Sequence, residues 1–345
     1  MAVNNKNVLV TGSEGYIGSV LMPMLLEAGW HATGLDCCYY AHGNLDGSYS
    51  ENWPVVRKDI RDLTPADFEN FDAVVHLAAL SNDPLGKLDE TLTMEVNFLA
   101  SEHLAQAAKS AGAKRFVYAS SCSLYGAADR ILTEDDPANP QTAYGRSKIM
   151  TENALTGLAD THFCPVFLRN ATAFGLSPRM RFDIVVNSLT GYAHTTNNIR
   201  ILGDGTPWRP LVHVRDICRG ILLALQARDA EVCAQAFNIG DSSENFQIRS
   251  IAEHVQHYYP ACSISIAQAN ANDTRNYMVS FEKAQRILGF HSTWSLDRGI
   301  DELRRAFISC GLTYATFQSP TYTRLLQIEE WKAQGKLDSA LRWSC

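Results

Sequence analysis

The sequence lacks the features that would place the protein in a membrane or on nucleic acid. No segment approaches the ~18 unbroken apolar residues of a membrane span, and neither a basic run nor a basic amphipathic segment is present. The net charge is −7 and the isoelectric point is near 5.8, which argue against a general binder of nucleic acid or anionic membranes. The apolar stretch in the opening MAVNNKNVLVTG is too short for a signal peptide. We therefore expect a soluble, cytoplasmic protein with neither nucleic acid nor membrane as a partner.

Metal-binding and disulfide patterns are missing as well. The nine cysteines form no CxxC pair and no Cys/His metal spacing, and their number is odd. Free thiols in a reducing compartment and the absence of a metal site are the expected outcome. His76 and His213 lie in the apolar stretches VVHLAA and LVHV, so we interpret both as buried core residues rather than ligands.

What the sequence does contain is an alternation of apolar bursts and helical stretches, in a chain of 345 residues with 46% hydrophobic content. The predicted buried strands are Asn7–Thr11, Ala32–Asp36, Val55–Lys58, Ala73–Ala78, Arg115–Ser120 and Val166–Arg169. The predicted helices are Ile17–Ala28, Thr91–Ala111 and Ala143–Leu158, with another in the tail at Tyr322–Gln334. Such alternation indicates a doubly wound parallel sheet of the α/β class, with ligands bound beyond the carboxyl ends of the strands.

A glycine-rich loop follows the first predicted strand. Gly12, Gly15 and Gly18 have the spacing GxxGxxG and precede a helix, as in loops that bring a pyrophosphate close to the backbone. Asp36 ends the second strand, where an acid can bind the hydroxyls of the adenosine ribose. Because a carboxylate there repels a 2′-phosphate and no arginine immediately follows it, the sequence favours NAD over NADP.

Tyr144 and Lys148 lie four residues apart in TAYGRSK, so on one helix they share a face. An unperturbed tyrosine titrates near ~10, and lowering its pKa by roughly 3 units requires about 4 kcal/mol of differential interaction. The Lys148 ammonium and an oxidised nicotinamide ring together could supply it. A serine cluster, Ser120–Ser123, precedes the pair at the end of a predicted strand, where a hydroxyl could hold a substrate oxygen.

These motifs resemble those of the extended short-chain dehydrogenase/reductase family, in particular its nucleotide-sugar epimerase/dehydratase branch. The resemblance rests on TGSEGYIG, DIRD at 59–62, HLAA at 76–79, SSCSLYG, YGRSK, DGTPWRPLVHVRD at 204–216 and DTRNYMVSFEKAQRILGF at 273–290. It covers about residues 6–310 and implies a Rossmann-type sheet with a smaller interleaved α/β substrate lobe, NAD as cofactor and a nucleotide-diphosphate sugar as substrate.

The resemblance also implies three sets of site residues. The catalytic set is Ser121, Tyr144 and Lys148. The cofactor-binding set is Gly12, Gly15, Tyr16, Ile17, Gly18, Asp36, Asp59, Ile60, Leu77, Ala78, Ala79 and Asn97, together with Tyr144 and Lys148. The substrate-binding set is Ser81, Ser121, Ser123, Asn170, Thr172, Arg209 and Arg275. Arg179 and Arg181, in SPRMRFD, are additional candidates because they lie in the predicted substrate lobe. The family often has an asparagine where this chain has Thr172, so the nucleotide and the sugar stay open.

Departures from the family pattern narrow the reaction. Related 4,6-dehydratases have an Asp-Glu pair after the catalytic hydroxyl residue, whereas this chain has Cys122 and Ser123. Relatives that epimerise at C3 and C5 place a cysteine one position later, and we interpret Cys122 as a buried free thiol. Epimerisation at C4 with retained NAD is the favoured function. A 4-keto-sugar reductase is the alternative, and a non-catalytic NAD sensor comes third.

The two lobes are expected to interleave. Residues 1–170 with about 211–244 are predicted to form the nucleotide-binding domain, and about 171–210 with 245–345 the substrate lobe and a helical tail. The resemblance further implies a homodimer through the helices at Asn97–Ala111 and Tyr144–Leu158.

Overall fold

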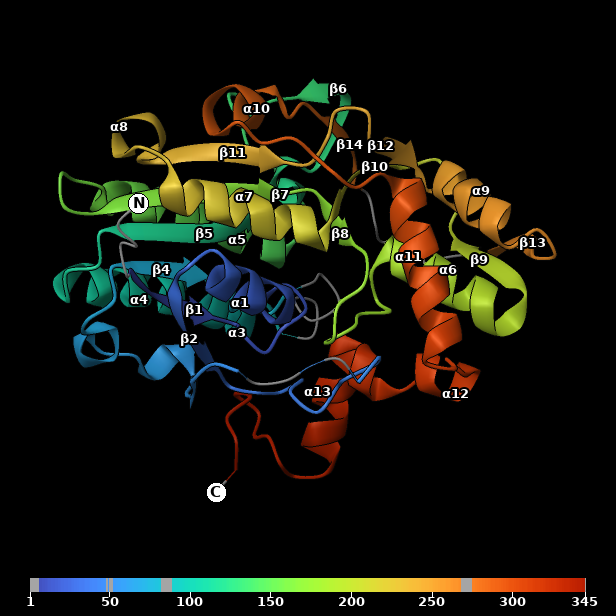
Figure 1. The fold of residues 1–345 in the computed structure, drawn as a ribbon, viewed down its shortest axis with the longest axis horizontal. Coiled ribbons are helices and arrows are strands. Elements are labelled where there is room, and N and C mark those ends of the chain that lie inside the picture. The colour runs from blue at the N-terminus through green and yellow to red at the C-terminus, as the bar shows by residue number, and fades with distance from the viewer. Residues whose placement is uncertain (1–5, 48, 50–51, 82–88, 268–274, 345) are drawn as a thin grey trace.

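A seven-stranded parallel sheet forms the larger half of the molecule (Figure 1). The computed structural model describes residues 6–47, 49, 52–81, 89–267 and 275–344. Along the sheet the strand order is β11-β7-β5-β4-β1-β2-β3. The strands are β1 (Asn7–Thr11), β2 (His31–Asp36), β3 (Val55–Arg57), β4 (Ala73–His76), β5 (Arg115–Ser121), β7 (Cys164–Asn170) and β11 (Gln235–Ile239).

Helices cover both faces of this sheet, with α1 and α7 on the near face of Figure 1 and α4 and α5 on the far face. The helices of this half are α1 (Gly18–Glu27), α3 (Glu90–Met94), α4 (Ala100–Ser110), α5 (Ala143–Leu158), α7 (Val214–Gln226) and α8 (Asp229–Val232). The doubly wound fold predicted from the alternating pattern is therefore confirmed. Because all strand pairs in the sheet are parallel, their carboxyl ends share one edge.

A smaller lobe lies at that carboxyl edge. Its helices are α6 (Val185–Thr196), α9 (Ile248–Tyr258), α11 (Leu296–Ser309) and α12 (Tyr314–Phe317). By contrast, α10 (Glu282–Leu288) packs on β11 and α7, and α13 (Arg324–Ala333) lies below the β2 side of the large sheet in Figure 1. The remaining strands pair as β8 (Thr172–Phe174) with β10 (Trp208–His213) and β12 (Asn245–Gln247), as β9 (Asn198–Leu202) with β13 (Ser263–Ala267), and as β6 (Ala127–Leu132) with β14 (Asn276–Val279). The chain returns from β10 to the large sheet through α7 and β11.

One predicted helix is not continuous. The stretch predicted as Thr91–Ala111 consists of α3, a π-helical turn at Glu95–Leu99 and α4. In this turn, the carbonyl of Asn97 accepts hydrogen bonds from Ser101 Oγ and Thr151 Oγ1. Two side-chain hydroxyls thus satisfy a backbone carbonyl inside the π turn. Single π turns within α-helices are frequent at functional sites.

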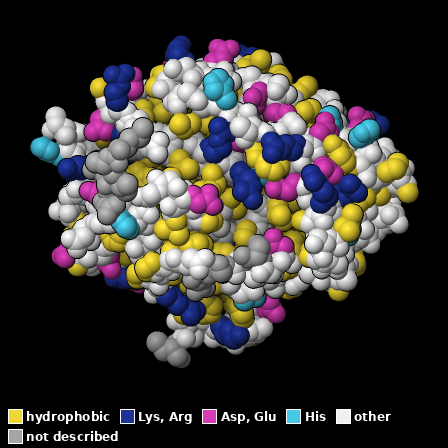
Figure 2. Space-filling view, in the orientation of Figure 1, with side chains coloured by type: hydrophobic (Ala, Val, Ile, Leu, Met, Phe, Trp, Pro, Cys, Tyr) yellow, Lys and Arg dark blue, Asp and Glu magenta, His cyan; other side chains and the backbone are white. Residues whose placement is uncertain are grey.

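The surface carries both signs of charge. On the face shown in Figure 2, basic and acidic side chains are interspersed, and neither forms a continuous patch. Among the helices of the described residues, none is long and apolar enough to cross a membrane.

Candidate active site

The glycine loop brings two strand ends into direct backbone contact. Gly12 has a φ of +79°, and a Cβ built on it would lie 2.7 Å from the Ala78 backbone nitrogen. A Cβ on Gly18 would lie 2.2 Å from the carbonyl oxygen of Gly12. Both positions therefore require glycine, the first for conformation and space, the second for close packing of α1 on the loop. The predicted turn is present between β1 and α1.

The N-terminus of α1 is available to an anion. The residue preceding the helix, Ile17, makes no side-chain cap, and the first turn contains no acidic residue. The N–H groups of Ser19 and Val20 donate to the carbonyls of Gly15 and Ile17, so it is the helix dipole that favours a negative charge at this position. A diphosphate group fits such a site.

Asp36 lies beside this loop at the end of β2. Its carboxylate accepts hydrogen bonds from the backbone N–H of Glu14, at 3.0 Å, and of Cys38, at 2.7 Å. Burial raises the pKa of Asp36, and the two backbone hydrogen bonds oppose this effect. The side chain is thereby fixed at the wall of a pocket, where it can accept hydrogen bonds from ribose hydroxyls.

That pocket gathers most of the predicted cofactor residues. The predicted members lining it are Gly12, Gly15, Tyr16, Ile17, Gly18, Asp36, Asp59, Ile60, Leu77, Ala78 and Ala79. Two residues predicted for the substrate, Ser81 and Arg181, line it as well. The lining residues that sequence reasoning missed are Cys37, Tyr39, Tyr40, Lys58, Arg61, Leu80, Val96, Ala173, Arg324 and Leu341. A carboxylate, an uncapped helix N-terminus and apolar walls together fit a dinucleotide such as NAD.

Asn97 acts behind the pocket wall. Its side chain accepts a hydrogen bond from Leu80 N at 2.7 Å and donates one to Leu80 O at 3.1 Å. The same amide donates to Ser147 Oγ on α5 at 3.4 Å. Asn97 therefore ties the segment after β4 to the helix that carries Tyr144 and Lys148.

Tyr144 and Lys148 lie on one face of α5, as predicted from their spacing. Thr142 caps this helix by accepting a hydrogen bond from Gly145 N, which places Tyr144 in its first turn. Lys148 Nζ lies 5.5 Å from the centre of the Tyr144 ring and donates to the carbonyl of Ala119 at 2.7 Å. Burial lowers the pKa of Lys148 to about 7, although the Glu152 carboxylate favours the charged form.

The serine cluster ends β5, next to β7. Ser121 and Asn170 are register partners at the carboxyl ends of these two strands, and Ser121 Oγ accepts a hydrogen bond from Ser123 N at 3.2 Å. Ser123 Oγ and Asn170 Oδ1 are buried and have no hydrogen-bond partner within the described part of the chain. Two polar atoms are thus left available to a polar ligand at this edge.

Cys122, the residue after Ser121, is fully buried. Its Sγ lies 3.1 Å from the carbonyl oxygen of Arg169. Burial raises the pKa of the Cys122 thiol well above its ordinary value. The neutral thiol is therefore a core group and a poor acid or base. The eight cysteines in the described residues are all free thiols.

Arg179 and Arg181 have different environments although both were predicted for the substrate. The Arg179 guanidinium forms a buried ion pair with Glu14 of the glycine loop, at 2.7 Å. Arg181 lines the pocket, pairs with Asp183 at 2.8 Å and lies 3.3 Å from Ser81 Oγ. The structure thus places Arg179 in the framework of the loop and Arg181 at the pocket.

Arg209 and Arg275 lie together in the smaller lobe. Arg209 Nη1 donates to the carbonyl of Arg275 at 2.7 Å, and Arg209 is buried. Thr172 lies on β8, opposite Leu211 of β10, the strand that carries Arg209. None of these three predicted substrate residues lines the dinucleotide pocket, although Ala173, the neighbour of Thr172 on β8, does.

The two histidines are satisfied core residues. His76 lies 2.6 Å from Thr11 Oγ1 and 2.7 Å from Ser101 Oγ, and burial lowers its pKa to about 3. His213 Nε2 lies 2.8 Å from a Glu302 carboxylate oxygen. The ring nitrogens named here lie within hydrogen-bond distance of protein side chains. Both histidines are therefore buried core residues, as predicted from the apolar sequence around them.

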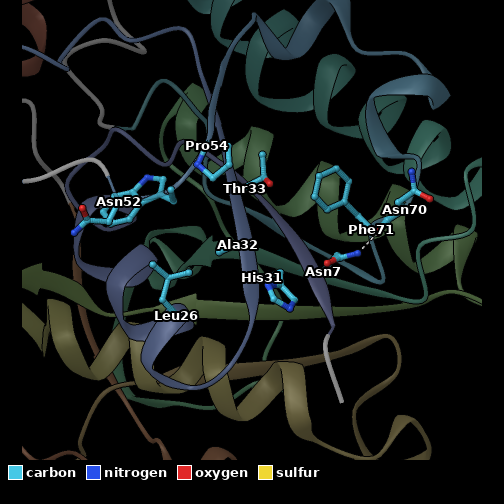
Figure 3. Close-up of a pocket in the computed structure, with 10 residues that line it drawn as sticks. Asn7, Leu26, His31, Ala32, Thr33, Asn52, Pro54, Asn70 and Phe71 are labelled. Carbon is cyan, nitrogen blue, oxygen red and sulfur yellow. Dashed lines mark hydrogen bonds between the residues drawn. The ribbon is translucent and has the colours of Figure 1, made fainter. Parts of the chain in front are cut away.

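A second cavity opens at the opposite edge of the sheet (Figure 3). It measures about 380 Å³. Its walls include Asn7 and His31, the first residues of β1 and β2, and Asn7 Nδ2 donates to the carbonyl of Asn70 at 2.8 Å. Because none of the predicted site residues lines it, the candidate active site is at the carboxyl edge.

Comparison with known proteins bears on this site. Residues 8–240 match the model of the NAD dependent epimerase/dehydratase family. A UDP-glucose 4-epimerase of Lacticaseibacillus casei is 30% identical, with 82% of this chain and 91% of that protein covered. A UDP-glucose 4-epimerase of Corynebacterium glutamicum is 28% identical, with 88% and 95% covered.

Solved structures show the same fold. MoeE5 in complex with UDP-glucuronic acid and NAD is 29% identical, with a TM-score of 0.76 over 87% of this chain and 99% of that one. A UDP-glucose 4-epimerase of Thermotoga maritima, solved with UDP-glucose, has a TM-score of 0.79 at 23% identity, over 89% of this chain and 100% of that one. The agreement extends over most of the length of each chain.

Asp36 is expected to set the choice between NAD and NADP. In Asp36→Asn, the preference for NAD over NADP should fall by at least about tenfold, because the repulsion of a 2′-phosphate is lost. Fluorescence titration with both dinucleotides measures the ratio. Glu69→Gln, an exposed acid outside the pocket, is the control. An unchanged ratio in Asp36→Asn would show that another residue makes the choice.

Lys148 is expected to make the cofactor-free protein more stable as the pH rises. Its folded pKa of about 7 lies below the ordinary value of 10.5, so the unfolded chain binds the extra proton between these values and stability increases with pH there. Relative to Lys148→Met, the parent should gain about 2–3 kcal/mol between pH 7 and pH 9 in urea unfolding. For Lys114→Met, at an exposed position, the difference in unfolding free energy from the parent should not change with pH. A difference between the parent and Lys148→Met that is the same at pH 7 and pH 9 would contradict the effect of burial.

Proposed function

The chain belongs to the NAD-dependent epimerase/dehydratase family, and we propose that it epimerises a nucleotide-diphosphate sugar at C4 through a transient 4-keto intermediate. The observation that carries this proposal is that Lys148 lies beside the Tyr144 ring on α5, while Ser121 ends β5 at the carboxyl edge. Tyr144 is close enough to Arg181 of the pocket wall to interact with its charge. The named relatives support it, since several are UDP-glucose 4-epimerases.

Tyr144 is the proposed acid and base. Its phenolate takes the proton of the sugar C4 hydroxyl during oxidation, and the phenol so formed returns that proton to the ketone oxygen during reduction. Ser121 holds the same oxygen through its hydroxyl. NAD bound in the pocket supplies the hydride acceptor and, once reduced, the hydride donor. The cofactor ends each cycle in its starting oxidation state.

Lys148 supports this proton transfer by its position. The hydrogen bond to Ala119 O holds the ammonium near the Tyr144 ring, and a cation there favours the phenolate. The Lys148 side chain is buried, so bulk water screens this interaction little.

The residues after Ser121 favour epimerisation over elimination. Elimination of water needs an acid and a base beside the sugar, but the positions after Ser121 hold Cys122 and Ser123. The Cys122 thiol is buried against Arg169 O and has a raised pKa. Ser123 offers a hydroxyl, which can bind a sugar but is a poor general acid and a poor general base at neutral pH.

Return of the hydride to the opposite face requires the sugar ring to turn while the nucleotide stays bound. Arg209 and Arg275 are the proposed contacts to the substrate diphosphate, since guanidinium groups bind phosphate well, and they lie together in the smaller lobe. Ser123 Oγ and Asn170 Oδ1 offer hydrogen bonds to the sugar at the sheet edge. The sugar ring can turn because the diphosphate is held by two arginines while the sugar itself makes few hydrogen bonds.

The decisive experiment incubates the protein with UDP-, GDP-, dTDP- and CDP-sugars while sugar products and the absorbance of reduced nicotinamide are followed. One C4 epimer pair should interconvert without net cofactor consumption. Tyr144→Phe should lower kcat by about 100- to 10,000-fold with bound NAD retained. Tyr314→Phe, at a half-exposed position, is the matched control.

Two other outcomes would overturn this proposal. Stoichiometric consumption of NADH or NADPH with a 4-keto sugar would identify a reductase. A protein that binds NAD equally well with and without Tyr144→Phe, and that converts none of the sugars, would be identified as a sensor.

We also propose that the protein is a cytoplasmic homodimer. Leu99, next to α4, and Met150, on α5, are 54% and 39% exposed, and apolar side chains on adjacent helices are typical of an interface. The free thiols are typical of a reducing compartment. Sedimentation velocity should give twice the chain mass of 38.2 kDa, and Leu99→Glu should reduce it. A parent protein that sediments as a monomer would contradict the proposed dimer. Recovery of the protein outside the cytoplasmic fraction would contradict the proposed location.

A further inference from the structure

The chain beyond α11 crosses back to the nucleotide half. After α13 it forms a turn closed by an isolated β-bridge between Leu337 and Trp343. Figure 1 shows this segment below the β2 side of the sheet. We call residues 324–343 the C-terminal clasp.

Polar contacts fasten the clasp to the loops after β2 and β3. Arg342 pairs with Asp59 at 3.3 Å and also with Asp62. Arg61 Nη1 donates to the carbonyl of Ala340 at 2.9 Å. The Trp343 indole donates to the carbonyl of Cys37 at 2.6 Å, and that of Trp331 to the carbonyl of Tyr39 at 2.9 Å. The clasp is thus bound to the segments that carry Asp36 and Asp59.

An apolar cluster completes this contact. Leu341 is 1% exposed and packs in one cluster with Tyr39, Leu80 and Leu92. The Tyr39 hydroxyl donates to the carbonyl of Leu341. Leu341 also lines the dinucleotide pocket, alongside Asp59 and other residues that follow β2 and β3. A residue of the clasp is therefore part of the pocket wall at the adenosine end.

Arg324 is a second clasp residue in the pocket wall. It is 3% exposed, its guanidinium lies 4.0 Å from the centre of the Tyr40 ring, and Nη2 donates to the carbonyl of Arg179 at 3.1 Å. Across the described residues, its guanidinium forms no salt bridge with a carboxylate. Burial and then the charge of Arg181 lower the pKa of Arg324 to about 10.

A buried cation without a counter-ion is costly, and an anionic ligand would compensate it. The pocket that Arg324 lines also contains the uncapped N-terminus of α1 and Arg181. Arg181 already has Asp183 as its partner. The carboxylates of Asp183 and Asp36 also attract Arg324, but neither forms a salt bridge with its guanidinium within the described residues, so a diphosphate in the pocket can pair with it directly.

We propose that the C-terminal clasp closes the adenosine half of the pocket over NAD, with Arg324 bound to the diphosphate and Leu341 packed against the adenosine. NAD can then leave only when the clasp detaches, so it remains bound over many turnovers. The clasp acts on NAD alone, so its role does not depend on which sugar or reaction the neighbouring site serves.

The test measures NAD content and NAD exchange in the purified full-length protein, without any sugar. Exchange of bound NAD for isotopically labelled NAD is followed by rapid filtration. The variants are Arg324→Met, Leu341→Ser and Arg342→Gln. The matched controls are Arg305→Met, on an exposed face of α11, and Leu326→Ser, which is 41% exposed on α13. Arg342→Gln alters a partly exposed anchor, so it loosens the clasp without changing a buried side chain.

All three variants should exchange NAD at least about tenfold faster than the parent, whereas the controls should match it. Arg324→Lys should restore part of the retention, since it keeps the charge. Rates for folded Arg324→Met and Arg342→Gln within about twofold of the parent would overturn the proposal.

Binding of smaller probes separates the two roles. In cofactor-free protein, Arg324→Met should weaken ADP-ribose by about tenfold and leave adenosine unchanged, because only ADP-ribose carries the diphosphate. Leu341→Ser should weaken both probes. Equal losses of adenosine and ADP-ribose in Arg324→Met would overturn the assignment of Arg324 to the diphosphate.

Discussion

The backbone contact between Gly12 and Ala78 is the constraint on which the site depends. It holds the ends of β1 and β4 together at the point where the strand order reverses, and a single added Cβ would separate them. The parallel sheet then sets the remaining groups in a row along one edge: Asp36 on β2, the glycine loop, Ser121 on β5 and Asn170 on β7. A dinucleotide and a sugar can therefore be bound side by side, because the sheet fixes the order of their contacts.

Buried ion pairs hold this edge in place from behind. Glu14, inside the glycine loop, pairs with Arg179 of the segment that leads to the smaller lobe. Glu152, one turn after Lys148, pairs with Arg169 of β7 and accepts a hydrogen bond from Ser120. Removing one partner from such a pair costs about 3–5 kcal/mol, since the other charge stays buried. The glycine loop and α5 are each secured by one buried ion pair.

Local patterns were sufficient to predict the sheet, the glycine loop and Asp36, whereas the other predicted pocket residues came from the family resemblance. β1 and α5 have the predicted bounds, because an apolar run and a capped helix are decided by neighbouring residues. The different environments of Arg179 and Arg181 were not predictable, since the two are only two positions apart and their partners come from distant segments. Arg324 and Leu341 were missed for a similar reason. Neither belongs to a motif, and only the folded path of the chain brings them to Asp36 and Asp59.

The two parts of the pocket wall are synthesised at different times. Asp36 and Leu341 contribute to one wall although 305 positions (341 − 36) separate them in the sequence. At about 5–20 residues per second, a ribosome needs roughly 15–60 seconds to make the intervening chain. During that interval the strands and the glycine loop can form while the pocket is still open on one side. On the proposed role of the clasp, the wall that retains NAD is completed only after residue 341 has been added and folded.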